Sequence, residues 1–145
     1  MIERIFPKQA DQNYVGHKAA EYTFALIAMI SLIRSLIHVF LPDGGAGVIA
    51  GLDLSQAGEN IVFAFGLWGV SQTIYALIQL LVAFRYKSLI PLMYILLILE
   101  TLGRMLIGII KPPVLLAIPP GGLANWLLLP LAIFMLYLSV KKIRA

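Results

Sequence analysis

Two arginines, Arg34 and Arg104, lie inside long apolar stretches, each eight residues before a proline, Pro42 and Pro112 respectively. An arginine side chain in hydrocarbon costs about 2.5 to 3.5 kcal/mol even on a lenient insertion scale, so each guanidinium needs a compensating partner. Guanidinium groups match the geometry of phosphate and carboxylate groups. The pair therefore predicts a site for an anionic group.

Helical spacing places other polar side chains near the two arginines. Glu100 lies one turn from Arg104, and one carboxylate beside two guanidiniums leaves an excess positive charge. We expect His38 and Asn60 above the arginines and Gln72 and Tyr75 below them. The predicted ligand-binding residues are Arg34, Arg104, Glu100, His38, Asn60, Gln72 and Tyr75. In the alternative, the same residues pair with one another and only fix the packing of the helices.

The remaining polar residues form no catalytic or metal-binding pattern. The two histidines, His17 and His38, are 21 residues apart, which is about 31 Å along a continuous helix, so they cannot share a metal ion. The serines lack the glycine-flanked elbow of a nucleophile. We predict no metal, no cofactor and no catalytic residue, and we keep acid–base chemistry by His38 on a lipid phosphate as an alternative.

The elements that position these residues follow from composition. Hydrophobic residues make up 61% of the 145 residues and charged residues 12%, and the mean hydropathy is +0.93, so the chain needs lipid around it. Four windows are long enough to cross a bilayer, at about 18–41, 59–84, 88–110 and 123–140. We predict an all-α, polytopic four-helix bundle, with an amino-terminal segment at 1–17 and a membrane domain at 18–145.

The distribution of lysine and arginine predicts the orientation. Eight of them flank the side that holds both termini and the middle loop, namely Arg4, Lys8, Lys18, Arg85, Lys87, Lys141, Lys142 and Arg144, whereas the other side has Lys111. Positive residues stay in the cytoplasm, so we expect both termini there. The net charge of +4 then reflects the orientation of the chain in the membrane, and it implies no nucleic-acid partner.

A gapless internal similarity relates the two arginine segments at a shift of 70 residues. The segment Ser31-Leu-Ile-Arg34-Ser-Leu-Ile-His38 aligns on Thr101-Leu-Gly-Arg104-Met-Leu-Ile-Gly108, and Pro42 aligns on Pro112. Leucine-rich helices also produce such similarity by chance. A true duplication would place two hairpins of equal orientation around an axis along the membrane normal, with the arginines at equal depth.

Helices two and three carry a family resemblance. Glu59 and Asn60 followed by Gly66 and Gly69, the short basic turn, and the stretch from Glu100 to Arg104 resemble small bacterial membrane proteins of the DoxX-like kind. The resemblance implies a four-helix fold and a bacterial inner membrane, and it implies no activity. Arg34 and His38 have no clear counterpart in it.

These patterns lead to a hypothesis about function. We expect a multi-pass membrane protein whose polar cavity, open to the outer leaflet, binds an anionic amphiphile such as a lipid phosphate, a prenyl phosphate or a quinone-like acid. An accessory subunit of a larger membrane complex is the alternative, and Gly66 and Gly69 would then permit close helix contact. A homo-oligomeric exporter or channel is a further alternative.

Overall fold

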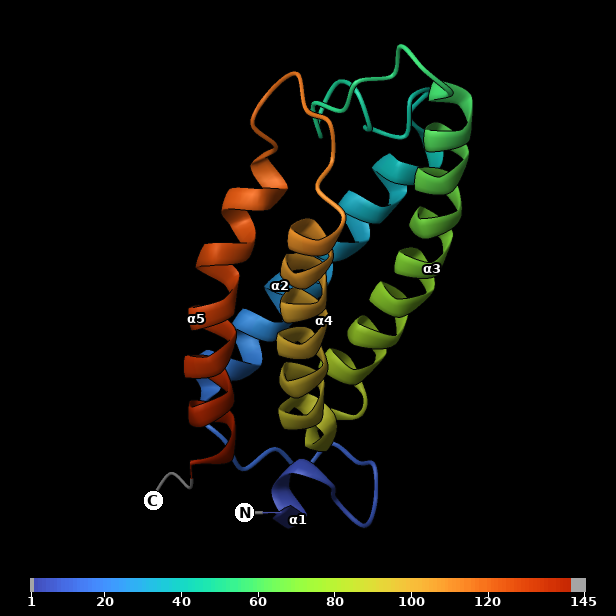
Figure 1. Ribbon diagram of the computed structural model, residues 1–145. Helices are drawn as coiled ribbons and strands as arrows, with labels where there is room; N and C mark the ends of the chain where they lie inside the picture. The colour runs from blue at the N-terminus through green and yellow to red at the C-terminus, as the bar shows by residue number, and fades with distance from the viewer. Residues whose placement is uncertain (1, 142–145) are drawn as a thin grey trace.

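The chain forms four long helices, which the computed structural model describes within residues 2–141. These helices are α2 (Lys18–Phe40), α3 (Gly58–Phe84), α4 (Ile90–Ile110) and α5 (Pro120–Val140), and each is long and apolar enough to cross a membrane (Figure 1). A short helix, α1 (Ile2–Ile5), precedes them, and a 3₁₀ turn, η1 (Lys87–Leu89), leads into α4. Residues 2–141 contain no strand beyond one isolated bridge. The predicted all-α four-helix bundle is confirmed.

The helix bounds agree with the predicted spans at most ends and differ at two starts. α4 begins at Ile90 with Pro91 in its first turn, and α5 begins at Pro120 rather than at residue 123. Proline is favoured at the first helical position, because its fixed φ suits a helix and its missing N–H leaves no donor there. α5 also continues through Pro130.

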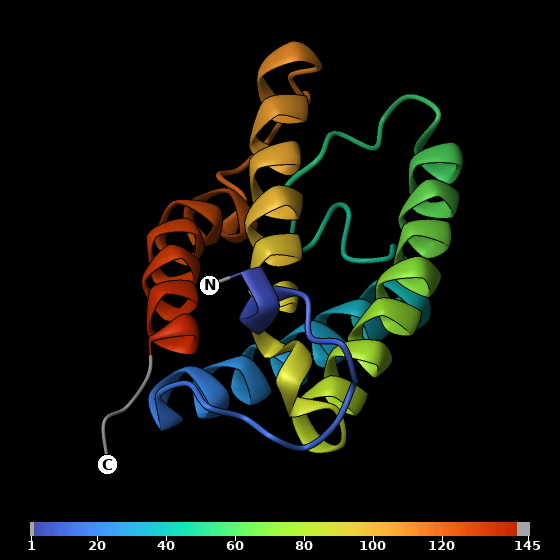
Figure 2. The ribbon, with the colours of Figure 1, turned by 90° about the horizontal axis from the view of Figure 1, so that it is seen from below.

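The helices pack as two hairpins. α2 packs along α3 and α4 packs along α5, with fewer contacts between the two pairs, and Figure 2 shows both pairs from below. Gly69 allows the close approach of α3 to α2, since a Cβ there would lie 2.8 Å from the Cβ of His38. Gly66 has open space around it, so only one of these two glycines serves this contact.

The tightly packed core lies near the end of the bundle that holds the amino terminus and the end of α5. Tyr94 donates a hydrogen bond of 2.7 Å to the carbonyl of Ala20, and its ring meets that of Phe24 edge-on at 5.6 Å. In the half nearer the loops, side chains of α4 and α5 are open, with Ile109 76% and Leu127 74% exposed. The helices of the two hairpins therefore pack together at one end and separate toward the other.

Two loops cover the opposite end. Residues 41–57 and 111–119 meet at an antiparallel bridge between Leu52 and Leu115. Asp53 donates its N–H to the carbonyl of Val114 at 3.1 Å, and Leu116 donates to Gly51 at 2.7 Å. The apolar run at 114–118 is thus tied to the first loop.

The amino-terminal segment crosses beneath the helices and is fixed to them by hydrogen bonds. Arg4 donates to the carbonyl of Val140, and the N–H of His17 donates to Leu138 at 3.0 Å. His17 then caps α2, because its Nδ1 accepts the N–H of Ala19 at 3.1 Å. The amino terminus and the last turn of α5 therefore lie on the same side (Figure 1).

Candidate functional site

Arg34 and Arg104 occupy equivalent positions on two different helices. Each lies six residues before the last residue of its helix, Phe40 in α2 and Ile110 in α4. At 1.5 Å per residue this is about 9 Å from the helix end. Both helices run toward the loop end, so the two arginines sit at similar depth below the loops.

A chain of hydrogen bonds joins the two arginines. Arg34 Nη2 donates to Gln72 Oε1 at 3.1 Å, and Gln72 Nε2 donates to Glu100 Oε1 at 3.2 Å. The same carboxylate oxygen accepts from Arg104 Nη1 at 2.6 Å, and Arg104 Nη2 also donates to Thr101 Oγ1 at 3.2 Å. Gln72 orients both ends of this chain, because its amide accepts from one side and donates to the other.

The two guanidiniums differ in how many of their N–H donors have an acceptor. Arg104 has an ion pair with Glu100 and a second acceptor in Thr101. Arg34 stacks on Trp68, with its Cζ 5.2 Å from the ring centroid, and within residues 2–141 Gln72 is its single hydrogen-bond partner. A guanidinium carries five N–H donors, so most of the donors of Arg34 are available to a ligand.

Both arginines lie in the wall of a cavity of about 540 Å³, to which all four long helices contribute. Its polar lining comes mainly from α2, α3 and α4, and its apolar lining mainly from α2 and α5. The residues are Thr23, Leu26, Ile27, Ile30, Ser31, Arg34, Trp68, Gln72, Tyr75, Gln79, Leu97, Glu100, Arg104, Gly121, Ala124, Asn125, Leu127, Leu128 and Leu131. Sites for small ligands combine a mostly apolar wall with a few convergent polar groups, as this cavity does.

The cavity is open on the side between α2 and α5. Leu26 is 60% exposed, Ile30 is 55% exposed and Leu127 is 74% exposed, and all three line it. These side chains belong to helices that pack together mainly in the other half of the bundle. A molecule could therefore reach the arginines sideways, without passing the loops.

Five of the seven predicted ligand-binding residues line this cavity, and two do not. His38 is buried under the first loop, where its Nδ1 lies 2.7 Å from the carbonyl oxygen of Gly44 and its ring lies 4.8 Å from that of Trp68. Asn60 is exposed in the first turn of α3. Both residues lie beyond the cavity, toward the loop end. Helical spacing predicts which face of a helix a residue lies on, but it does not predict how far along the helix the cavity extends.

The contribution of α5 was not predicted from the sequence. None of its residues is among the predicted ligand-binding residues, yet Gly121, Ala124 and Asn125 form part of the cavity wall. Apolar residues carry no chemical signal, and Asn125 lies close to the start of the helix, where a polar side chain is ordinary. Trp68 and Gln79 also line the cavity, and each lies four residues along α3 from a predicted residue, Gln72 and Tyr75 respectively, so helical spacing is a signal that could have identified them.

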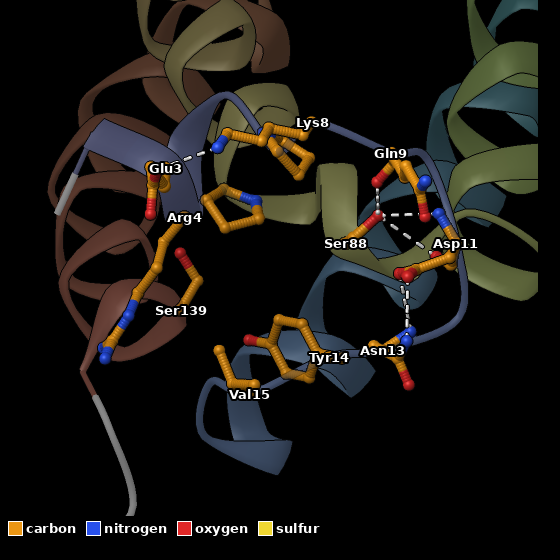
Figure 3. Close-up of a pocket in the computed structure, with 12 residues that line it drawn as sticks. Glu3, Arg4, Lys8, Gln9, Asp11, Asn13, Tyr14, Val15, Ser88 and Ser139 are labelled. Atoms are coloured by element: carbon orange, nitrogen blue, oxygen red, sulfur yellow. Dashed lines mark hydrogen bonds and ion pairs between the residues drawn. The ribbon is translucent and has the colours of Figure 1, made fainter.

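A second pocket, of about 470 Å³, lies under the bundle between the amino-terminal segment and the ends of α4 and α5 (Figure 3). Its charged side chains are balanced, with Glu3 3.8 Å from Lys8 and Asp11 accepting hydrogen bonds from Asn13. The hydroxyl of Ser88 accepts the N–H of Asp11 at 2.9 Å. These contacts attach the segment to the bundle and leave no excess charge, so this pocket has no feature that selects a ligand.

No family model, curated protein or solved structure matches the chain. The DoxX-like resemblance thus stays a prediction from the sequence. Among residues 2–141 no group of three histidine, aspartate or glutamate side chains is placed to hold a metal ion. The candidate site is therefore defined by its geometry alone.

Proposed function

We propose that this multi-pass membrane protein binds an anionic, single-chain amphiphile in the cavity between its two hairpins. The observation that carries the proposal is the incomplete pairing of Arg34, whose guanidinium faces a largely apolar cavity with one hydrogen bond and one aromatic contact. Arg34 and Arg104 would hold the anionic head, and Glu100 would orient Arg104.

Charge balance favours an anion over a cation or a neutral lipid. Two guanidiniums and one carboxylate leave one positive charge among the polar groups of the cavity. Removing such a charge from water is costly unless an opposite charge approaches it, and the lipid surroundings supply none at this depth. A phosphate or carboxylate head would supply that charge and would accept hydrogen bonds from both guanidiniums.

The apolar wall favours an alkyl or prenyl chain attached to that head. Ile27, Ile30 and Leu97 line the cavity on one side of the arginines, and Leu128 and Leu131 line it from α5. The side opening between α2 and α5 would admit such a chain directly from the bilayer. With the cytoplasmic orientation of both termini that the basic residues predict, the arginine end of the cavity lies in the outer half of a membrane, which we propose is a bacterial inner membrane.

Native mass spectrometry of the detergent-extracted protein tests the proposal, with octadecyl phosphate added as a defined probe. We expect the wild type to retain an anionic adduct, and Arg34→Leu to weaken binding of the probe by about 10- to 100-fold, the equivalent of one charge-assisted hydrogen-bonded pair. Arg34 is the better position to change, because Arg104→Leu alone would leave the carboxylate of Glu100 unpaired.

Arg85→Leu is the matched control, since it removes the same charge from an exposed residue at the C-terminal end of α3 that does not line the cavity. It should leave the adduct and the affinity unchanged. Equal retention by wild type and Arg34→Leu, or equal loss in both variants, would contradict the proposal.

The accessory-subunit alternative rests on a different observation. Gly66 is half-buried on α3, yet nothing lies within 4 Å of where its Cβ would be, so another helix could approach closely there. Gly66→Leu would then release a partner protein from the mildly solubilised complex while leaving the adduct on Arg34 in place. A change confined to the adduct would favour the binding function instead.

A further inference from the structure

One of the two carboxylate oxygens of Glu100 has no hydrogen bond. Glu100 Oε1 accepts from Gln72 Nε2 at 3.2 Å and from Arg104 Nη1 at 2.6 Å. Within residues 2–141, no side chain or backbone N–H donates to Glu100 Oε2. Each oxygen of an ionised carboxylate can accept hydrogen bonds, so half of this group is free to accept from a ligand.

This free oxygen is accessible rather than enclosed by protein. Among the residues from 2 to 141 that are not exposed, the one side-chain nitrogen or oxygen atom that is both buried and unpaired belongs to Gln79. Glu100 Oε2 is unpaired and is not such an atom, so it has accessible surface, and the whole side chain is 24% exposed.

The geometry of α4 directs that accessible surface into the cavity. The residues that α4 contributes to the lining are Leu97, Glu100 and Arg104. Their spacing of three and four residues places them on one face of the helix. Leu97 is 3% exposed, so this face points into the bundle. The unpaired oxygen of Glu100 is therefore an acceptor within reach of a ligand beside Arg104.

An anion held by the arginines would lie close to this carboxylate. Arg104 Nη1 already donates to Glu100, so a ligand oxygen that accepts from the remaining donors of Arg104 approaches the same guanidinium from another edge. Two negative groups at such a distance repel each other, and the repulsion is stronger in an apolar cavity than in water. A hydrogen-bond donor on the ligand would give Glu100 Oε2 a partner and reduce this repulsion.

A hydroxyl suits this position better than an ammonium group does. Arg104 already pairs with the carboxylate, and Arg34 lines the same cavity, so an ammonium group would lie beside two guanidiniums of the same charge. An ammonium group also loses far more hydration than a hydroxyl when it leaves water. A hydroxyl provides the donor without adding a charge.

We propose that the ligand carries a hydroxyl next to its anionic group, and that this hydroxyl donates to Glu100 Oε2 while Arg34 and Arg104 hold the anion. The proposal rests on the proposed function and makes the ligand class narrower. The shared chemistry is a hydroxylated anionic head, which occurs in single-chain glycerol phosphates and in 3-hydroxy acids.

The test measures the dissociation constants of three phosphates of equal chain length on the purified, delipidated protein in detergent. They are octadecyl phosphate, 2-hydroxyoctadecyl phosphate and 2-methoxyoctadecyl phosphate. A hydroxyl can donate to a carboxylate, whereas an ether oxygen can only accept. We expect the hydroxy compound to bind about tenfold more tightly than octadecyl phosphate, as for a hydrogen bond to a charged group. The methoxy compound should bind no more tightly than octadecyl phosphate.

A second pair of probes, octadecanoic acid and 3-hydroxyoctadecanoic acid, distinguishes the two sources of such a head. A preference for the hydroxylated compound among the phosphates alone would assign a phosphate head. A preference among the acids alone would assign a carboxylate head. A preference in both series would support the hydroxylated anion as the shared requirement.

Glu100→Gln replaces the free acceptor with a donor. The amide oxygen stays on Arg104, which can only donate, so the amide nitrogen takes the place of Oε2. We expect the preference for the hydroxy over the methoxy compound to disappear, because an N–H donor can bond to either oxygen. Glu59→Gln is the matched control, since Glu59 is exposed in the first turn of α3 and does not line the cavity. It should keep the tenfold preference.

A thermal melt checks the fold of Glu100→Gln, and the comparison of ligands on the wild type tests the proposal without any variant. Equal binding of octadecyl phosphate and the hydroxy compound, together with equal binding of the two acids, would overturn it. Tighter binding of 2-aminooctadecyl phosphate than of the hydroxy compound would also overturn it, since the carboxylate would then recognise a cation. A preference that persists in Glu100→Gln would place the hydroxyl at another residue.

Arg34→Leu separates the failure of this inference from the failure of the proposed function. It should weaken all of these probes together, whether or not they carry a hydroxyl. A loss of affinity in Arg34→Leu without any preference for the hydroxyl would overturn the inference and leave the proposed function intact. Binding that is indifferent to Arg34 would overturn both.

Discussion

The two arginines have different tasks at the scale of single residues. Arg104 is held by Glu100 and Thr101 and has little freedom to turn. Arg34 rests on the face of Trp68, which stabilises a guanidinium without using its N–H donors. Arg34 is thus positioned and still able to bind, and Glu100 sets how much positive charge the cavity presents.

A first prediction concerns Glu100→Gln. The change keeps an acceptor for Arg104 and removes the negative charge, so the cavity gains a full positive charge. We expect binding of octadecyl phosphate to strengthen by about tenfold, or about 1.4 kcal/mol. We also expect the ligand-free variant to unfold at a lower temperature than the wild type, because Arg104 loses its ion pair. Thermal unfolding with and without the probe measures both effects.

A change of affinity other than the predicted increase would give Glu100 another role. Weaker binding in Glu100→Gln would mean that the carboxylate is needed to hold Arg104 in its binding geometry. An unchanged affinity would mean that the anion does not approach Arg104 at all.

The sequence predicted most of the polar residues that line the cavity, but it did not predict where the cavity ends. Arg34, Glu100, Arg104, Gln72 and Tyr75 were found because polar residues inside apolar helices have few physical explanations. His38 and Asn60 satisfy the same criterion, but their depth relative to the first loop depends on how that loop folds over α2. That loop is irregular, and no periodicity describes it.

At the scale of elements, the first loop is organised by Asp43. Its carboxylate accepts the backbone N–H groups of Val48 at 2.8 Å, Gly45 at 2.8 Å and Gly47 at 3.0 Å. These hydrogen bonds favour the charged form and hold the pKa of Asp43 below its ordinary value of 3.8. The loop therefore gains stability from Asp43 at pH values above 3.8.

The lowered pKa of Asp43 predicts how the stability of the first loop depends on pH. Because the pKa of Asp43 is lower in the folded protein than in the unfolded chain, the contribution is complete above about 3.8 and is lost as the pH falls through the folded value. NMR titration of the Val48 amide should show a midpoint below 3.8 in the wild type. Asp43→Asn should abolish that titration and increase hydrogen exchange at Gly45 and Gly47. A midpoint at or above 3.8 would contradict it.

A further prediction at this scale separates the loops from the side opening. Neighbours of Leu52 and Leu115 exchange hydrogen bonds, so these two residues form a non-hydrogen-bonded pair whose Cα atoms lie close enough for a disulfide. The chain has no cysteine of its own, so Leu52→Cys with Leu115→Cys can tie the loops cleanly. We expect this disulfide to leave binding of octadecyl phosphate unchanged.

Filling the side opening should have the opposite effect. Ala124 lines the cavity on the exposed part of α5, and Ala124→Trp should weaken binding of octadecyl phosphate by about tenfold or more, because the ring occupies the path of the chain. Ala64→Trp is the matched control, since Ala64 is exposed on α3 and does not line the cavity. Loss of binding on oxidation of the loop cysteines would instead place the access route at the loops.

At the scale of the whole molecule, the bundle is two hairpins whose helices pack together at one end and whose loops are bonded to each other at the other. The sequence predicted four spans and their order, because length and hydropathy determine both. It did not predict which pairs would separate, since apolar side chains facing lipid and apolar side chains facing another helix look alike in a membrane protein. The internal similarity between the Arg34 and Arg104 segments stays a prediction: a true duplication would relate α2 with α3 to α4 with α5.

The orientation of this molecule in the membrane decides which leaflet the cavity faces, and single cysteines can test it. The eight basic residues beside the termini and the middle loop predict that the loop end faces outward. Val48 in the first loop is 83% exposed, and Gln9 in the amino-terminal segment is also exposed. In intact cells, a membrane-impermeant maleimide should label Val48→Cys and leave Gln9→Cys unlabelled until the membrane is opened. The reverse pattern would turn the cavity toward the cytoplasmic leaflet, and the ligand would then have to come from the pool of anionic amphiphiles in that leaflet.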